Sequence, residues 1–219
     1  MEPSLERRMM EVQRRIASRV VLDDRFSDDL LGGVDQAFPG DLVVSGAVLL
    51  DSCLEVISTS CHAMRAAIPY LPGLLSFREG APAVMAIRAL HPRPDIVFVD
   101  GCGINHPRMA GLACYIGVLL DLPAIGVSKG VLCGRAEPPQ REGDAEPLIH
   151  EGRLVGYLLC SRKGCRPIVV APGHRISADS ALELARRTLR GHKLPEPCRL
   201  AHEHARRITA APPEREASS

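Results

Sequence analysis

The stretch DIVFVDGCGINHPRMAGLACYIGVLLDLPAIGVSK, residues 95–129, decides the fold class. Residues 95–99 are a nearly continuous apolar run that ends at Asp100, which is typical of a strand covered on both faces. Residues 108–120 have the pattern of a helix, and residues 124–127 form a second short strand. Strand, helix and strand in this order indicate a right-handed crossover between parallel strands. The sequence therefore predicts an α/β fold.

On the N-terminal side of this unit, three short apolar runs alternate with turn residues. The runs cover residues 31–38, 42–50 and 53–58, with Pro39–Gly40 and Asp51–Ser52 between them. This pattern predicts three strands of an antiparallel meander. We therefore expect a mixed sheet, the meander plus parallel strands, flanked by helices. The remaining patterns predict a helix over 5–20, a helix over 74–90, a loop over 135–152, strands over 154–160 and 167–170, and a helix over 177–190.

Length and composition fit a single globular domain. The chain has 219 residues, of which 46% are hydrophobic and 24% are charged, and this is enough for one core. We expect one domain over residues 1–210 and a flexible tail over residues 211–219. No apolar stretch reaches the roughly 18 residues of a membrane span, and the N-terminus lacks the apolar run of a signal peptide. We therefore expect a cytoplasmic protein without membrane contact, and a monomer.

Net charge and cysteine spacing exclude few functions. The net charge of +1 gives no global basic field, so any binding to nucleic acid depends on a local patch. The eight cysteines form no C-x-x-C pair, which argues against a zinc site or a disulfide framework. A Cys53–Cys61 or Cys160–Cys165 bridge is the alternative for an organism that lives in heat. Otherwise the thiols are expected to act as small buried apolar groups.

Three carboxylates have positions that point to chemistry. Asp35 lies inside the first strand among apolar neighbours, Asp100 ends a buried strand, and Glu79 lies near the start of a helix. A carboxylate in apolar surroundings needs a cation, hydrogen bonds or a raised pKa. Mg²⁺ binds one or two protein carboxylates and leaves its other positions to water and phosphate oxygens. Either aspartate alone can equally cap a turn. If their strands are neighbours, the acids predict a metal site for phosphodiester hydrolysis.

Three further segments carry cationic or imidazole groups near the same strands. His174 follows the strand over 167–170, and a loop there would bring it to the acids, where it can bind metal or position water. Lys129 ends the strand over 124–127 and can contact a phosphate. His106 and Arg108 flank a proline at a helix start and can donate to a phosphate. The alternatives are a solvated histidine, a surface lysine and a simple helix-entry turn.

The run IPYLPG, residues 68–73, places Tyr70 between Pro69 and Pro72. Prolines fix their own φ and bias the preceding residue to extended geometry, so the ring is expected on a stiff turn. Such a turn can act as a wedge in a base stack or support an extruded base. It can equally pack on the core as a rigid loop.

Taken together, these motifs resemble the endonuclease V family, the nucleases directed at deaminated bases. The similar stretches follow the family's order and cover most of the chain. They are GVDQAF (33–38), PYLPGLLSFREG (69–80), FVDGCGINHPRMAGLA (98–113), PAIGVSKGVLCG (123–134), APGHRIS (171–177) and KLPEPCRLAH (193–202).

The resemblance implies an RNase H-like fold and magnesium-dependent cleavage of the second phosphodiester bond 3′ to a deoxyinosine or inosine. The products would carry a 3′-hydroxyl and a 5′-phosphate, and Mn²⁺ can stand in for Mg²⁺. By position, the resemblance assigns metal binding to Asp35, Glu79 and Asp100, a place near the metal and the attacking water to His174, and phosphate contact to Lys129. It assigns the strand-separating wedge to Pro69, Tyr70, Leu71 and Pro72, and base contacts to backbone groups near Leu75, Gly101 and Gly126.

Two alternatives to a DNA repair enzyme stay open on these residues. The first is an endoribonuclease directed at inosine in RNA, because no residue can be assigned to a 2′-hydroxyl. The second is a binding module that marks deaminated bases without cleaving them, which would require that the acids bind no metal.

Overall fold

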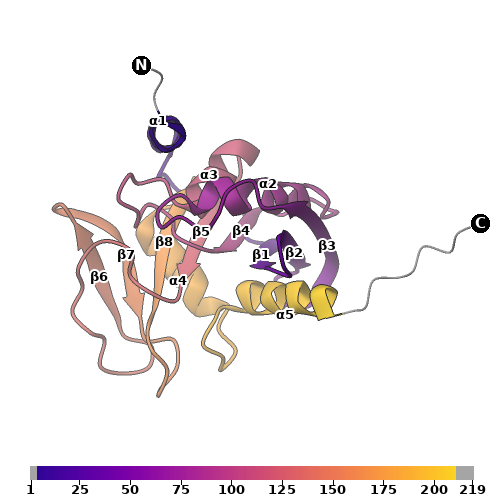
Figure 1. Ribbon diagram of the computed structural model, residues 1–219. Helices are drawn as coiled ribbons and strands as arrows, with labels where there is room; N and C mark the ends of the chain where they lie inside the picture. The colour runs from indigo at the N-terminus through magenta and orange to yellow at the C-terminus, as the bar shows by residue number, and fades with distance from the viewer. Residues whose placement is uncertain (1–3, 211–219) are drawn as a thin grey trace, which may run out of the picture.

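An eight-stranded mixed sheet forms the centre of the computed structural model, which describes residues 4–210 (Figure 1). The strand order is β3-β2-β1-β4-β5-β8-β7-β6. Strands β1, β4 and β5 are parallel, and all other neighbours pair antiparallel. This confirms the predicted meander and crossover. The strands are β1 Leu31–Ala37, β2 Leu42–Leu50, β3 Val56–Arg65, β4 Ile96–Asp100, β5 Ala124–Ser128, β6 Ala145–His150, β7 Arg153–Leu159 and β8 Ile168–His174.

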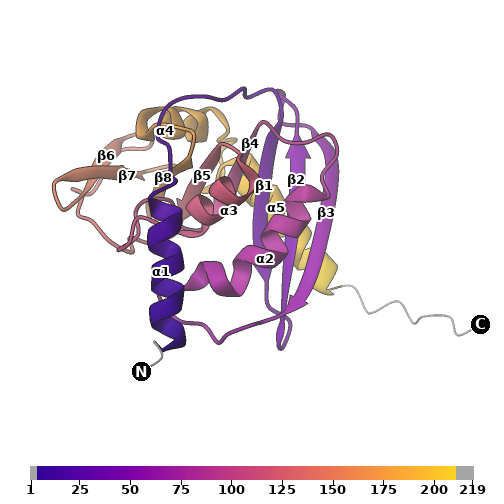
Figure 2. The ribbon, with the colours of Figure 1, turned by 90° about the horizontal axis from the view of Figure 1, so that it is seen from above.

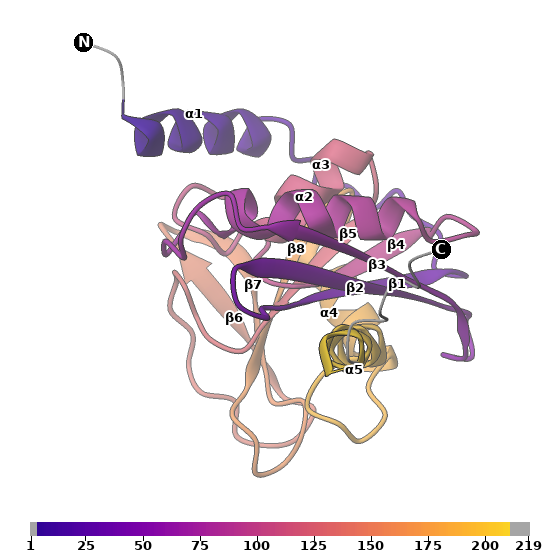
Figure 3. The same cartoon turned by 45° about the vertical axis from the view of Figure 1, so that its right-hand side comes forward.

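Helices cover both faces of the sheet. Helices α2 (Leu75–Arg88) and α3 (Leu112–Leu120) lie on one face, and α4 (Ala178–Arg187) and α5 (Glu196–Ala210) lie on the other (Figure 3). Side chains of β4 alternate between the two resulting cores. Phe98 packs with residues of α4 and α5, and Val97 packs with residues of α2 and α3. The apolar run of β4 therefore marks a strand covered on both faces, as predicted.

Helix α1 (Leu5–Ala17) lies outside this sandwich, alongside α3 (Figure 2). Its Ile16 packs with Cys114 and Val118 of α3. The side-chain oxygen of Ser4 caps the helix by accepting a hydrogen bond from the Arg7 N–H. The predicted amphipathic helix is thus confirmed, although it ends three residues earlier than expected.

Three elements differ from the sequence prediction. The third strand runs over Val56–Arg65 instead of 53–58, because an edge strand with half-exposed serines needs no apolar run. The segment 135–152, predicted as a loop, contains the edge strand β6, whose proline is tolerated because an edge strand leaves some N–H positions unpaired. Helix α5 was not predicted, since it buries few large apolar side chains; its buried residues are Glu196, Pro197, Cys198, Ala201 and Ala205.

Two glycines allow α5 to lie close against β1 and β2. A Cβ atom at Gly33 would stand 2.0 Å from the Pro197 carbonyl oxygen, and one at Gly46 would stand 2.7 Å from the Ala205 nitrogen. Any larger residue would push the helix away from the sheet. The close contact brings the middle of α5 over the end of β1.

Several expectations about the chain as a whole can also be compared with the structure. All eight cysteines, which lie within residues 4–210, are free, so the predicted alternative of a Cys53–Cys61 or Cys160–Cys165 bridge is wrong. Among residues 4–210, no helix has the length and apolar character needed to cross a membrane. The predicted tail over 211–219 lies outside the described residues.

Candidate active site

Asp35 and Asp100 lie side by side where the neighbouring inner strands β1 and β4 end, and we call this end of the strands one edge of the sheet. Strands β1 and β4 are parallel with Val34 paired to Val99, and each aspartate is the next residue along its strand. Glu79, on α2, is 5% exposed, as is Asp35. Burial raises the pKa of Glu79, and the charges of Asp35 and Asp100 raise it further, so the Glu79 carboxyl group lies within reach of both aspartates' charges. We call Asp35, Glu79 and Asp100 the acid cluster.

Burial and mutual repulsion both oppose ionisation within the acid cluster. Burial, followed by the charge of Asp100, raises the pKa of Asp35 to about 6 despite hydrogen bonds from Gln36 and His202. Burial, followed by the charge of Asp35, raises the pKa of Glu79 to about 8. A cation placed among these oxygens would remove the repulsion and favour the charged forms.

Two basic side chains already contact the acid cluster. The Lys129 Nζ atom, just after β5, lies 2.7 Å from Asp100 Oδ2. Burial alone would lower the pKa of Lys129, but the charges of Asp100 and Asp35 raise it. His202 of α5 places its Nδ1 atom 2.7 Å from Asp35 Oδ2. Lys129, for which the sequence predicts a phosphate contact, therefore lies beside the acids, and His202 joins them from an unpredicted helix.

The donor set of the acid cluster fits a magnesium ion. Within residues 4–210, no group of three His, Cys, Asp or Glu side chains is arranged to hold a metal by itself. Magnesium needs no such group, because it commonly takes one or two protein carboxylates and completes its shell with water and phosphate oxygens. Asp35 and Asp100 can supply those two carboxylates, and their oxygens are the hard ligands that Mg²⁺ prefers.

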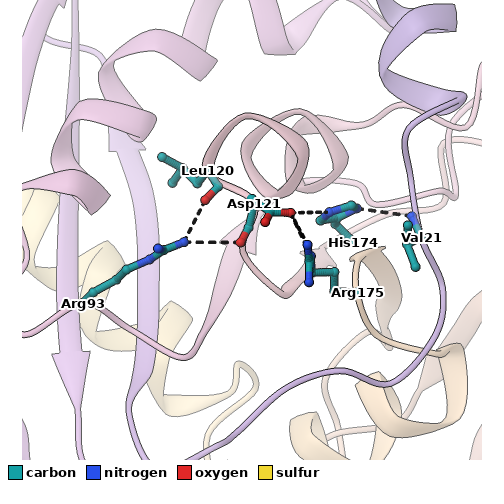
Figure 4. A network of polar contacts seen from close by, with 6 residues as sticks. All are labelled: Val21, Arg93, Leu120, Asp121, His174 and Arg175. Atoms are coloured by element: carbon teal, nitrogen blue, oxygen red, sulfur yellow. Dashed lines mark hydrogen bonds and ion pairs between the residues drawn. The ribbon is translucent and has the colours of Figure 1, made fainter.

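His174 does not lie at the acid cluster, contrary to the sequence prediction, and instead it contacts Val21 and Asp121 (Figure 4). Strand β8 runs antiparallel to β5 and continues to His174, which pairs with Ala124 at the start of β5, whereas Asp100 pairs with Val127 near its end. The end of β8 is therefore at the opposite edge of the sheet. There His174 Nδ1 accepts a hydrogen bond of 3.2 Å from the Val21 N–H, and Nε2 lies 3.6 Å from Asp121 Oδ1.

A pocket of about 300 Å³ lies between the 69–73 turn and the start of α3. Tyr70, Leu75 and His106, all predicted substrate contacts, line it. The predicted base contacts Gly101 and Gly126 do not line it, and the Gly101 N–H donates to the Val127 carbonyl at 2.9 Å within the sheet. The other lining residues are Gly73, Ser76, Cys102, Gly111, Leu112, Gly130, Val131 and Leu132.

Helix α2 begins at this pocket without a side-chain cap. The N–H groups of Leu75 and Ser76, in its first turn, have no hydrogen-bond partner among the described residues. Both residues line the pocket, so these donors are available to an acceptor bound there.

The turn over 69–73 protrudes from the surface beside the pocket. Tyr70 is 66% exposed, Pro69 and Pro72 are exposed, and Leu71 is half-buried. An exposed aromatic ring on a proline-stiffened turn keeps the predicted wedge role open. The predicted phosphate donors His106 and Arg108 instead turn toward this segment, at 3.0 and 2.7 Å from the Gly73 carbonyl oxygen.

The fold and this site define a nuclease of the RNase H-like class. Its carboxylates lie on adjacent parallel strands with a lysine beside them, and the lining of the pocket includes Cys102, two residues after Asp100. Comparison with known proteins gives the family. The family model described as Endonuclease V matches residues 14–203. Endonuclease V of Xanthomonas axonopodis pv. citri (strain 306) is 44% identical over 203 residues, which are 90% of this chain and 86% of that protein.

Solved structures agree with this family. The crystal structure of Endonuclease V from Streptomyces avermitilis has a TM-score of 0.87 and 35% identity to this chain, and the match covers 94% of this chain and 93% of that one. Endonuclease V of Ciona intestinalis, solved with a 24mer DNA containing an inosine followed by a ribo-adenosine, has a TM-score of 0.80 and 21% identity, covering 93% and 97%. This chain belongs to the endonuclease V family, and it is a nuclease that hydrolyses phosphodiester bonds.

Proposed function

We propose that this nuclease uses Mg²⁺, or Mn²⁺ in its place, to cleave DNA at deaminated bases, chiefly deoxyinosine, in DNA repair. Cleavage is at the second phosphodiester bond 3′ to the lesion and leaves a 3′-hydroxyl and a 5′-phosphate. The observation that carries the proposal is the acid cluster, in which two buried carboxyl groups hold raised pKa values beside a pocket.

Asp35 and Asp100 would hold the metal, and Glu79 would add a third carboxylate near them. Bound Mg²⁺ would polarise the scissile phosphate and stabilise its developing negative charge. Lys129 holds one Asp100 oxygen at 2.7 Å and brings a positive charge to the place where the phosphate must bind. His202 holds one Asp35 oxygen at 2.7 Å, which fixes the orientation of that carboxylate.

The pocket supports recognition of a base turned out of the stack. Hypoxanthine presents a carbonyl oxygen where adenine presents an amino group. The unpaired N–H groups of Leu75 and Ser76 can donate to that oxygen and would face another donor if adenine entered. An unpaired buried donor costs roughly 1 to 3 kcal/mol, enough for a marked preference. The inosine in the DNA bound to the Ciona protein is consistent with this class of ligand.

The turn over 69–73 would hold the strands apart while the base occupies the pocket. Tyr70 is exposed beside the pocket, and an aromatic ring can stack on the bases that remain. Pro69 and Pro72 stiffen the turn, which lowers the entropy lost when it inserts.

Product mapping tests the proposal most directly. An end-labelled DNA strand containing one hypoxanthine is incubated with the protein in Mg²⁺, in Mn²⁺ and in chelator. The expected product is a single cut at the second bond 3′ to the lesion, only with metal. A cut at random positions, or equal cutting of a matched adenine strand, contradicts the proposal.

The same assay separates the proposal from its alternative, an endoribonuclease directed at inosine in RNA. Matched deoxyinosine DNA and inosine RNA compete for limiting enzyme, and faster loss of the RNA would favour the alternative. The cytoplasmic location and the monomeric state stay predictions. Light scattering after size-exclusion chromatography tests the monomer.

A further inference from the structure

Three side chains converge on one backbone oxygen, the Gly73 carbonyl. Gln13 Nε2 lies 2.8 Å from it, His106 Nε2 lies 3.0 Å from it and Arg108 Nη2 lies 2.7 Å from it. A carbonyl oxygen has two lone pairs, so three donors saturate its capacity to accept hydrogen bonds. We call Gln13, His106 and Arg108 the Gly73 clamp.

Gln13 is the member of the Gly73 clamp that lies farthest away in sequence, on α1. It is 2% exposed and occupies the same helix face as the buried Met9 and Ile16, where an apolar residue would be expected. A buried amide must satisfy both of its ends. Gln13 does so through Nε2 to Gly73 and through Oε1, which accepts a 2.5 Å hydrogen bond from Arg108 Nε.

The hydrogen bonds of His106 fix its tautomer. The Arg108 N–H donates to His106 Nδ1 at 3.1 Å, so Nδ1 is an acceptor and Nε2 carries the proton that points to Gly73. Burial lowers the pKa of His106 to about 4, which keeps the ring neutral near pH 7. The Gly73 clamp is therefore a complete set of donors and acceptors, with Gln13 as its link to α1.

Gly73 connects the clamp to the pocket. It ends the turn that carries Tyr70, it lines the pocket, and its φ of +76° lies in the left-handed region that favours glycine. Two residues later α2 begins at Leu75, which also lines the pocket. The direction of the Gly73 carbonyl thus sets both the turn and the first donors of α2.

We propose that Gln13 is a positioning residue: through the Gly73 carbonyl, α1 fixes the 69–73 turn and the mouth of the pocket, and so sharpens the choice of base. The part of the inference that concerns the choice of base rests on the proposed function. The part that says Gln13 holds the 69–73 turn does not. Helix α1 is then part of the recognition apparatus, although none of its residues lines the pocket.

Two variants of Gln13 separate this role from simple packing. Gln13→Glu keeps an oxygen for Arg108 and adds an ion pair, but it has no proton to donate to Gly73 near pH 7 and repels that carbonyl. Gln13→Met keeps the volume and removes both hydrogen bonds. Val12→Glu, one position away on an exposed part of α1, adds the same charge without touching the clamp and is the matched control.

The first measurement is amide hydrogen exchange across residues 69–76, which needs no activity. Loss of one hydrogen bond corresponds to about a fivefold change. We expect exchange in this segment to accelerate at least about fivefold in both Gln13 variants and to stay unchanged in Val12→Glu.

The second measurement is single-turnover cleavage of hypoxanthine and adenine strands over a range of enzyme concentrations. In Gln13→Glu we expect the half-saturating concentration for the hypoxanthine strand to rise about fivefold and the preference over adenine to fall by about the same factor. A purely structural role would lower the melting temperature and leave both quantities unchanged.

The outcomes distinguish the two proposals. If the wild-type protein does not cut hypoxanthine strands, the proposed function fails, and the exchange data still decide whether Gln13 holds the turn. If the wild type cuts them and Gln13→Glu keeps wild-type exchange and preference, the inference is overturned. If Gln13→Met does not fold, the inference is decided by Gln13→Glu alone, because this variant keeps an oxygen for Arg108.

Discussion

The two edges of the sheet use the same kinds of side chain for opposite purposes. At the edge that carries the acid cluster, burial raises the pKa values of Asp35 and Glu79, and the charges of neighbouring aspartates raise them further. At the far edge, the side chain of Asp121 is 70% exposed, and Arg175 at 2.6 Å and His174 at 3.6 Å surround it (Figure 4). The hydrogen bond from Arg175 lowers the pKa of Asp121.

The difference between the edges is the balance of charge and the access of water. The acid cluster has more carboxylates than basic partners, and burial weakens the screening between them. At the far edge, Asp121 lies among the basic side chains of Arg175 and His174. His174 also ties the segment after α1 to the sheet, because it accepts a hydrogen bond from the Val21 N–H. Only the edge with the acid cluster would be stabilised by a bound dication. A histidine or an aspartate near a strand end therefore does not by itself mark the active site.

The largest expected contrast is between Asp100 and Asp121. Asp100→Asn removes a ligand charge from the acid cluster and should lower the cleavage rate by about 10³-fold or more, because phosphate charge is no longer stabilised. Asp121→Asn should change it less than about threefold. Single-turnover cleavage of a hypoxanthine strand in Mg²⁺ measures both. Comparable losses in the two variants would remove the distinction between the edges.

The second largest expected effect is the pH dependence of stability, which should follow from the raised pKa values of Glu79 and Asp35. In the unfolded chain, Glu79 and Asp35 lose their protons near their ordinary pKa values. In the folded chain, Glu79 keeps its proton up to about pH 8 and Asp35 keeps its proton up to about pH 6. The folded state binds more protons in this range, so the stability of the metal-free protein falls as pH rises.

The free energy of unfolding of the metal-free protein is expected to fall by about 2 to 4 kcal/mol between pH 5 and 8. Mg²⁺ should restore this stability. Urea unfolding in chelator and in Mg²⁺ measures the change. Glu79→Gln is the internal control, because it should flatten the upper part of the profile, between about pH 6.5 and 8. A wild-type profile that parallels that of Glu79→Gln would contradict the raised pKa.

A smaller effect is expected at His202. His202→Ala leaves the Asp35 carboxylate without the partner that orients it, and loss of such a partner typically costs 10- to 100-fold in metal affinity or activity. The Mg²⁺ concentration at half-maximal rate should rise in this variant. The neighbouring exposed Glu203→Gln on α5 is the control. An unchanged magnesium dependence in His202→Ala would leave the contact without a role in the site.

Sequence alone predicted the elements that have a strong apolar pattern. Strands β4 and β5 and helix α3 follow from residues 95–129, and parallel neighbours place Asp35 beside Asp100. The direction of β8 could not be read from its residues, because an apolar run gives no orientation. The prediction for His174 was therefore wrong, since a strand that runs antiparallel ends at the far edge.

The histidine at the acid cluster was missed for a different reason. His202 lies on α5, whose buried face consists mainly of small or polar residues and gives no apolar stripe. The only signal was KLPEPCRLAH, which resembles the family and ends at His202. Gly33 and Gly46 hinted at a close neighbour, but which segment packs there depends on contacts far apart in the chain.

The smallest effect is expected at His174 and concerns stability, not chemistry. His174→Ala removes the acceptor of the Val21 N–H in a part-buried setting and should cost about 1 to 2 kcal/mol, a fall in melting temperature of roughly 2 to 8 °C. His174→Asn can place an amide oxygen near the position of Nδ1 and should recover part of the loss. The cleavage rate at 25 °C, where both variants remain folded, should stay within about twofold of the wild type. A folded His174→Ala protein that no longer cleaves would instead show that the far edge reaches the chemistry through the segment after α1, because that segment is what His174 holds.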